Sequence, residues 1–243
     1  MMITRHKTTA LLNFKFREIL KNKTFLVSAA MVPGFVLMYR LLFDDVENMS
    51  GIQVFLLNFG VSYAMIMVGM FMSATFLAKD KEKQTLRTWM TSSVSSLEYL
   101  VSMIIPFLVL TILMIVMVIG ISGMNPEAID FPVFILVIFL SSLTAIILGM
   151  LVGLVSKNQM AASNNSLLFV FIFFLVPTFS DMNQTLERIS EFLFTGVVSN
   201  MIAGFGEGGL PLAMQDYLVL IGSLVLAIVA FIMVYRKNGF ETD

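Results

Sequence analysis

Cysteine and histidine, two of the side chains that most often perform catalysis or bind metals, are nearly absent from this chain. It has no cysteine and a single histidine, His6, which lies in a polar N-terminal segment. Disulfides and thiolate metal sites are therefore excluded. A histidine-based catalytic or metal centre within the apolar segments is excluded as well. We expect no catalytic residue and no metal site in this sequence.

Small polar side chains do interrupt the apolar stretches, and these are the candidates for handling a substrate. The residues are Asn58, Ser62, Tyr63, Asn164 and Asn165. In hydrocarbon, such groups either line a polar path or hydrogen-bond across neighbouring helices. The sequence leaves both interpretations open. No acidic residue lies deep in an apolar stretch, so a proton relay is not indicated.

Six long apolar stretches must position these polar residues. The chain is 58% hydrophobic and 13% charged, whereas a soluble domain carries about 25% charged residues. A helix crosses the bilayer with about 20 apolar residues, and continuous rather than alternating apolar runs disfavour a β-barrel. We predict an all-α integral membrane protein with six transmembrane helices, at residues 24–43, 52–78, 97–122, 131–156, 162–179 and 217–235.

The basic residues predict the orientation. All lysines and arginines except Arg40 and Arg188 fall on one side of the six crossings. Because basic residues stay in the cytoplasm, we expect a multi-pass protein of the plasma membrane with both termini cytoplasmic. Arg40 should reach outward from the first helix and pair with Asp44, one helical turn further on.

Residues 8–23 predict an interfacial amphipathic helix before the first crossing. Its apolar half holds Leu11, Leu12, Phe16, Ile19 and Leu20, and its polar half holds Arg17, Glu18 and Lys21. Phe14 and Lys15 break the pattern. We expect this helix to lie at the membrane surface with its lysines toward anionic headgroups. Whether it is an inert anchor or a lever that moves with the first crossing stays open, with Phe16, Arg17 and Leu20 as its candidate contact residues.

Residues 79–98 form the largest inner loop. Its first half is charged and helix-prone, and Leu86, Trp89 and Met90 repeat at helical spacing. Ser95 and Glu98 fit a capping box that opens the next helix. Such a short helix either docks in a groove of a soluble partner or anchors Trp89 among the headgroups.

Residues 180–216 separate the fifth and sixth crossings on the outer side. This connection is long for a structureless loop, and we expect one or two short amphipathic helices dipping into the outer leaflet. The glycine-rich end at residues 204–211 breaks the helix before the last crossing. Elsewhere, Gly149 and Gly153 allow a neighbouring backbone to approach, and Pro33 with Gly34 predicts a kink or a close helix contact.

The segment 79–103 resembles the cytoplasmic coupling segment of the type-2 ABC transporter permease family. The matching positions are Glu82, Thr85, Leu86, Trp89, Met90, Ser92, Val94, Ser95, Glu98 and Leu100. The departures are Gln84 for a glycine, Arg87 for a glutamate, Ser93 for a proline and Met103 for a lysine. The order of elements along the whole chain, and the stretch 149–159, are also similar to that family.

The resemblance implies a single transmembrane permease domain over residues 1–243. Two permeases, identical copies or sister chains, would pair around a central path within membrane lipid. Each would dock on an ABC ATPase subunit through the 79–98 loop and the N-terminal helix. The implied ATPase contacts are Glu82, Thr85, Leu86, Trp89, Met90 and Val94.

The resemblance further implies an exporter of an amphiphile, such as an antimicrobial or other peptide, a drug, a lipid or a polysaccharide. ATP and Mg would be used by the partner subunit, and no cofactor is expected on this chain, which lacks the G-x-x-x-x-G-K-[ST] motif. No nucleic acid partner is implied. An intramembrane enzyme is disfavoured because the crossings lack His and Lys, whereas an ion-coupled carrier or a non-catalytic membrane scaffold remains the alternative.

Overall fold

The computed structural model describes residues 5–43, 51–85, 96–206 and 212–237, and no strand occurs in these ranges. Six helical segments in them are long and apolar enough to cross a membrane. They are Lys23–Phe43, Ile52–Glu82, Glu98–Ser122, Phe131–Val155, Gln159–Thr178 and Met214–Lys237. The prediction of an all-α integral membrane protein with six crossings is therefore confirmed.

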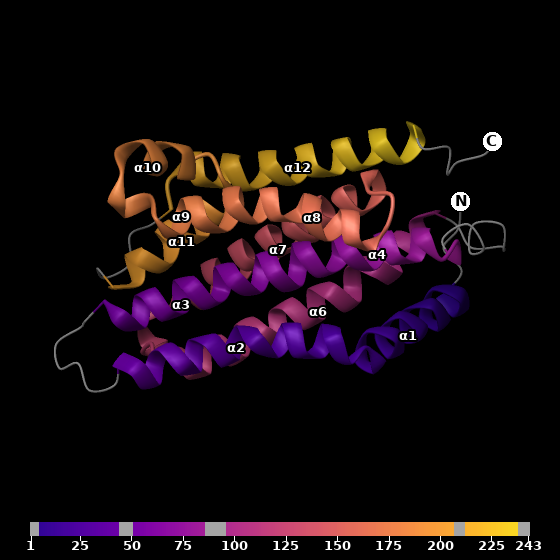
Figure 1. Ribbon diagram of the computed structural model, residues 1–243. Helices are drawn as coiled ribbons and strands as arrows, with labels where there is room; N and C mark the ends of the chain where they lie inside the picture. The colour runs from indigo at the N-terminus through magenta and orange to yellow at the C-terminus, as the bar shows by residue number, and fades with distance from the viewer. Residues whose placement is uncertain (1–4, 44–50, 86–95, 207–211, 238–243) are drawn as a thin grey trace.

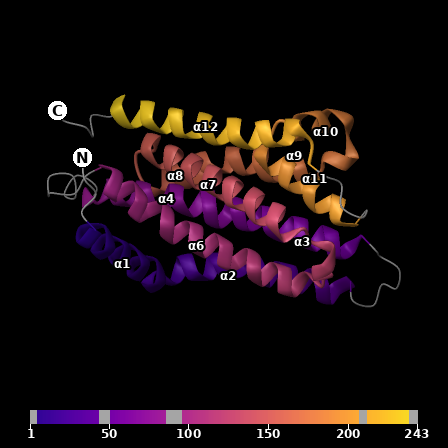
Figure 2. The same ribbon diagram turned by 180° about the vertical axis from the view of Figure 1, so that it is seen from behind.

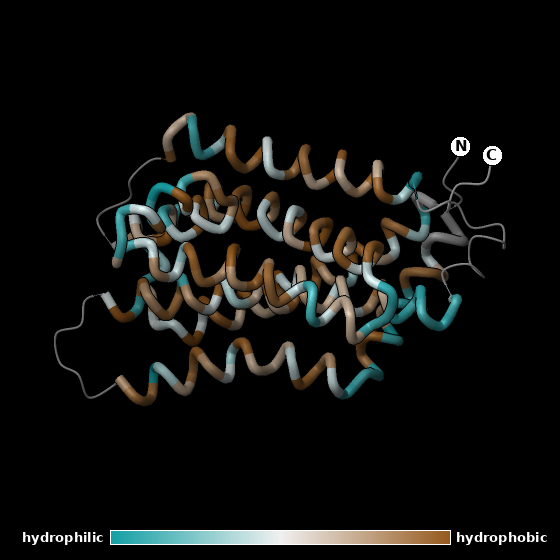
Figure 3. Tube along the Cα trace, turned by 45° about the horizontal axis from the view of Figure 1, so that its top comes forward, coloured by the Kyte–Doolittle hydropathy of each residue, from teal (hydrophilic) through white to brown (hydrophobic). Residues whose placement is uncertain are grey.

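The six segments lie side by side in one bundle, as Figures 1 and 2 show. Helix α1 (Arg5–Lys21) lies at the same end of the bundle as the last turn of α12 (Met214–Lys237). We call this the basic end. Helix α10 (Gln184–Ser190) lies at the opposite end. Figure 3 shows hydrophilic residues gathered toward both ends, with mostly hydrophobic residues between them, as a bilayer requires.

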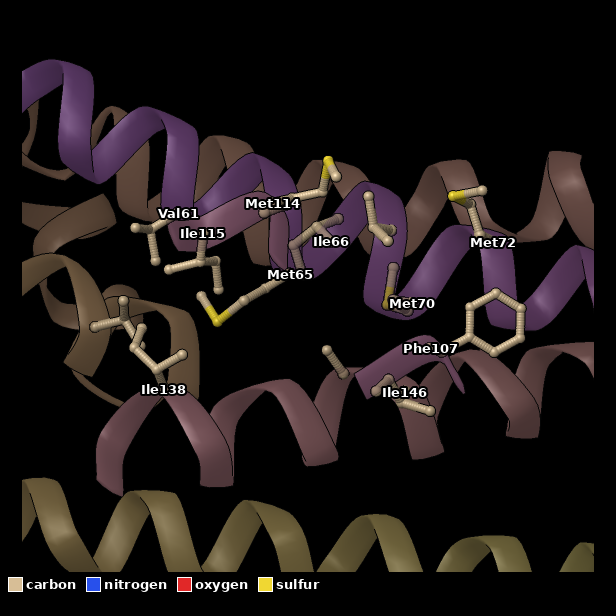
Figure 4. Close-up of a cluster of buried hydrophobic side chains, with 14 of the residues drawn as sticks. Val61, Met65, Ile66, Met70, Met72, Phe107, Met114, Ile115, Ile138 and Ile146 are labelled. Carbon is tan, nitrogen blue, oxygen red and sulfur yellow. The ribbon is translucent and has the colours of Figure 1, made fainter. Parts of the chain in front are cut away.

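The second and fourth crossings form the centre of the bundle. The second consists of α3 (Ile52–Tyr63), the π-helical segment η1 (Ala64–Met72) and α4 (Ser73–Glu82), and the fourth is α7 (Phe131–Val155). In each, 61% of the most apolar window is buried within the protein, against 17% in α12. Figure 4 shows the core between them and α6 (Ser96–Ser122), where Met65, Met70 and Met114 pack with branched aliphatic residues.

Two glycines on α7 allow the central crossings to approach closely. A Cβ at Gly149 would lie 2.1 Å from the Met70 carbonyl oxygen, and one at Gly153 would lie 2.6 Å from the Ala74 carbonyl oxygen. The four-residue spacing predicted this approach. Gly34, on α2 (Lys23–Phe43), differs, because no atom lies within 4 Å of a Cβ built there. The close contact considered for Gly34 is therefore not present.

The fifth crossing also contains a π-helical segment. It runs through α8 (Gln159–Val170), η3 (Phe171–Leu175) and α9 (Val176–Thr178). Pro177 has no N–H to donate to the preceding turn, which explains why the helix widens just before it.

The long connection between the fifth and sixth crossings is helical. It holds η4 (Ser180–Met182), α10 and α11 (Phe194–Gly206). The short helices expected here are present, and the apolar face of α11 packs on α3 and α7, where Phe194, Val197 and Ile202 are buried; their insertion into the outer leaflet stays a prediction.

Arg40 lies near the end of α2 that is remote from α1. Its Nη1 donates a hydrogen bond to the carbonyl oxygen of Ile121, in the last turn of α6. A cation at a helix C-terminus is stabilised by the unsatisfied carbonyl groups there. Asp44, the partner expected for Arg40, lies outside the described residues.

Candidate functional site

The helix of the second crossing continues past its expected end at residue 78 and reaches Glu82 at the basic end. The first part of the expected 79–98 loop is therefore helical, and the remainder joins α4 to α6. Of the contact residues expected here, Glu82 is exposed and Thr85 is half-buried. Leu86, Trp89, Met90 and Val94 lie outside the described residues.

A buried ionic cluster lies where the end of α4 meets α1 and α6. Lys15 of α1 and Asp80 of α4 form an ion pair, and the Tyr99 hydroxyl of α6 donates a hydrogen bond of 2.7 Å to Asp80 Oδ2. The three residues are 0%, 2% and 1% exposed. The Lys15 ammonium also lies 5.0 Å from the ring centroid of Phe76. Charges are tolerated at such burial only when they are paired and hydrogen-bonded, so the cluster holds three helices in one arrangement.

Glu18 extends the cluster to its half-exposed rim. Its carboxylate accepts from Lys15 at 3.5 Å and from Lys79 at 3.2 Å. Solvent-exposed ion pairs stabilise a protein by only about 0–1 kcal/mol each, and Glu18, with its side chain 25% exposed, is partly screened by water in the same way. Glu18 therefore contributes less to the link between helices than the buried pair beneath it.

The end of α4 is also tied to the turn between α7 and α8. Lys81 Nζ donates to the carbonyl oxygens of Leu154 at 2.6 Å and Ser156 at 3.1 Å, where α7 ends. Glu82 Oε2 accepts from the backbone N–H of Gln159 at 3.0 Å, where α8 begins. The Lys81 cation lies at the C-terminus of α7 and the Glu82 anion at the N-terminus of α8, and the helix dipole favours these signs. Four crossings and α1 thus meet around the last turn of α4.

Gln84, one of the departures from the family pattern, has a backbone conformation that favours glycine. Gln84 has a φ of 56°, in the left-handed region, immediately after the helix cap at Lys83. Helices commonly end with glycine in this conformation because a side chain is disfavoured there. The resembling family has glycine at this position, so its backbone requirement is retained here with a less suitable residue.

The N-terminal helix differs from the expectation in its buried face. Leu11, Lys15 and Ile19 form the buried stripe at four-residue spacing, whereas Leu20 is 57% exposed. Lys15, expected to interrupt the pattern and face headgroups, instead points into the protein because Asp80 provides a partner. Of the other candidate contact residues, Phe16 is half-buried and Arg17 is exposed.

The candidates for a polar path form two separate groups. Asn58 donates to Ser199 Oγ on α11 at 2.7 Å, and Ser62 donates to Asn58 Oδ1 at 3.5 Å. Tyr63 stacks on Phe59 with ring centroids 5.8 Å apart.

The second group lies on α8. Asn165 Nδ2 donates to Ser156 Oγ at 3.0 Å, near the basic end, and Asn164 is exposed. The amides of Asn58 and Asn165 thus bond across helices at different places in the bundle, and the structure does not bring the two groups together.

The fold defines a multi-pass helical membrane protein with a buried ionic cluster beside the connection between α4 and α6. The sequence model described as ABC-2 family transporter protein matches residues 24–234. The chain therefore belongs to the ABC-2 transporter family and is a membrane permease subunit of an ABC transporter. Association with an ABC ATPase is a general property of this family. No curated protein and no solved structure matches the chain.

The family match divides the ionic cluster. Asp80 and Tyr99 lie within the matched residues, whereas Lys15 precedes them on α1. The helix that supplies the buried cation therefore lies outside the matched residues. The sequence analysis did not predict this cluster. The signal that could have indicated it is the spacing of Lys15, which lies four residues after Leu11 and four before Ile19 and therefore shares their helix face.

Proposed function

We propose that this permease drives ATP-dependent export of an amphiphile across the plasma membrane, with its basic end in the cytoplasm. The ATPase would dock on the 79–98 segment and on α1. A second copy of the chain, or a sister permease, would complete the path. ATP would be hydrolysed, with Mg²⁺ as the cofactor, in the ATPase subunit alone.

The ionic cluster is the observation that carries this proposal. A push on the connection after Glu82 acts on the last turn of α4, which is bonded to α1, α6 and the α7–α8 turn through Asp80, Lys81 and Glu82. Because buried charges resist separation, these elements would move as one body. A group of helices that moves together could transmit a movement of the ATPase subunits to the rest of the bundle.

Orientation follows from charge. Nearly all lysines and arginines lie at the basic end or in segments adjacent to it, and the positive-inside rule places that end in the cytoplasm. ATP is available there, so the largest connection at that end is the one within reach of an ATPase.

The class of substrate is inferred from the core. The centre of the bundle carries several buried methionines, among them Met65, Met70 and Met72 (Figure 4). Their unbranched, polarizable side chains repack around irregular apolar shapes. When the bundle opens to a cargo, such a lining would suit an amphiphile such as a peptide, drug, lipid or polysaccharide.

Docking is tested by copurification. We expect the ABC ATPase that copurifies with the tagged permease to be lost on Leu86→Asp or Trp89→Asp, because either places a charge in the apolar stripe of the proposed contact. Phe192→Asp is the matched control, since Phe192 is 70% exposed at the opposite end of the bundle. Equal recovery of the ATPase with all three variants would refute the docking site.

Direction and energy source are tested in inside-out vesicles with a fluorescently labelled short-chain phospholipid as the probe amphiphile. Export predicts that ATP drives accumulation in these vesicles and that ionophores have no effect. Accumulation that needs an ion gradient without ATP would favour an ion-coupled carrier, and ATP-driven loss from the vesicles would indicate import.

A further inference from the structure

An open pocket at the elbow between α1 and α2 gathers basic side chains. It has a volume of about 620 Å³, room for roughly 20 water molecules. Its lining residues are Phe14, Arg17, Glu18, Lys21, Asn22, Lys23 and Lys79. Four of the seven are cations and one is an anion.

The side chains that line the pocket carry an excess of positive charge. Its only anion, Glu18, already interacts with Lys15 and Lys79. Within the described ranges, Arg17, Lys21 and Lys23 form no ion pair. The C-terminus of α1 and the N-terminus of α2 meet at Asn22, so their opposite dipoles largely offset each other. The attraction for an anion therefore comes from three side chains, and a phosphate offers enough acceptor oxygens to satisfy all of them.

The position of the pocket relative to the membrane surface indicates a lipid ligand. Lys23 is the first residue of the first crossing, so the pocket lies where water meets hydrocarbon. Val27 and Met31 follow Lys23 at four-residue intervals and are 63% and 44% exposed, which places them on one stripe of α2 below Lys23. Phe14, 45% exposed, adds apolar surface at the rim. A charged pocket above an apolar stripe matches the two parts of a phospholipid.

We propose that this pocket binds the headgroup of an anionic phospholipid. The phosphate contacts Arg17, Lys21 and Lys23, and an acyl chain lies along Val27 and Met31. Soluble phosphates share the anionic group but make no use of the stripe. The site adjoins the ionic cluster through Glu18 and Lys79, whose charges are already paired, and it requires neither ATP nor a particular cargo.

The test is a lipid titration of the detergent-solubilised full-length chain, monitored by native mass spectrometry. Dioleoylphosphatidylglycerol should bind in preference to dioleoylphosphatidylcholine. The triple variant Arg17→Gln, Lys21→Gln, Lys23→Gln should weaken phosphatidylglycerol binding on the order of a hundredfold, from roughly fivefold for each basic residue removed. The triple variant Lys83→Gln, Lys157→Gln, Lys237→Gln is the control, because it removes the same charge from exposed positions near the same end.

Four outcomes overturn the proposal. Equal losses in the two triple variants would show a general electrostatic attraction without a site. Displacement of the lipid by equimolar glycerophosphoglycerol or inorganic phosphate would show a site for soluble anions. Loss of the copurifying ATPase from the pocket variant, with phosphatidylglycerol binding intact, would assign the surface to the partner. Unchanged binding to Lys21→Glu, with helical content checked by circular dichroism, would refute the site even if the triple variant folds poorly.

Discussion

Lys15 and Asp80 are 65 residues apart in the sequence, yet they form an ion pair within the protein. The pair joins a helix outside the family match to the end of the second crossing. The pair lies beside the connection on which we propose that an ATPase docks.

Breaking this pair on one side should be far more damaging than removing it altogether. Asp80→Asn removes the buried counter-charge of the Lys15 ammonium and leaves it only the partly exposed carboxylate of Glu18, so we expect a loss toward the lower end of about 3–5 kcal/mol in the free energy of unfolding. The triple variant Lys15→Met, Asp80→Leu, Tyr99→Phe should be near neutral or more stable, because it removes the buried polar groups together. Unfolding followed by circular dichroism in detergent measures both.

The same variants separate stability from coupling. If the cluster transmits force, the triple variant should keep its fold and its bound ATPase but lose most ATP-driven transport. Full transport by this variant would show that the cluster serves folding alone.

Gln84 should be a site of avoidable backbone strain. Gln84→Gly is expected to stabilise the protein by about 1 kcal/mol, because glycine adopts the left-handed conformation without steric cost. Gln84→Val should destabilise it, since a β-branched residue is the least suited to positive φ. The two variants are compared with the unmodified protein by thermal unfolding. A transition temperature of Gln84→Gly below that of the unmodified protein would mean that contacts of the glutamine side chain stabilise the protein more than its φ destabilises it.

The close approach of α7 to the second crossing depends on Gly149. Gly149→Ala should destabilise the bundle by about 1–3 kcal/mol, because the added methyl group forces the two backbones apart. Gly222→Ala on α12 is the control: its Cβ would meet no atom within 4 Å, and alanine in a helix is favoured by about 1 kcal/mol. The two variants should therefore shift the unfolding temperature in opposite directions.

The proposed orientation is readily tested because the chain has no cysteine. In intact cells, a membrane-impermeant maleimide should label Met182→Cys, which is 79% exposed, and should leave Lys157→Cys and Lys237→Cys unlabelled until the membrane is opened. Labelling of Lys157→Cys and Lys237→Cys on opposite sides would refute the six-crossing topology.

The sequence by itself determined the number and class of the crossings. Each depends on the length of an apolar run, which is a local property that the bilayer reads directly. The spacing of Gly149 and Gly153 also predicted a close backbone approach, because residues four apart share one helix face. The motif at residues 79–103 was sufficient to indicate the family that the match over residues 24–234 then showed.

Only the tertiary structure decided where the charges go. Sequence patterns assign Lys15, Lys79, Asp80 and Lys81 to water, since burying an isolated charge is too costly. The packing of α1, α4 and α6 reverses this for Lys15 and Asp80 by supplying a counter-charge and a hydroxyl donor at one point. Such partners lie on different helices, so no local pattern reveals them, and the long-range arrangement of the bundle selects which charges become part of its interior.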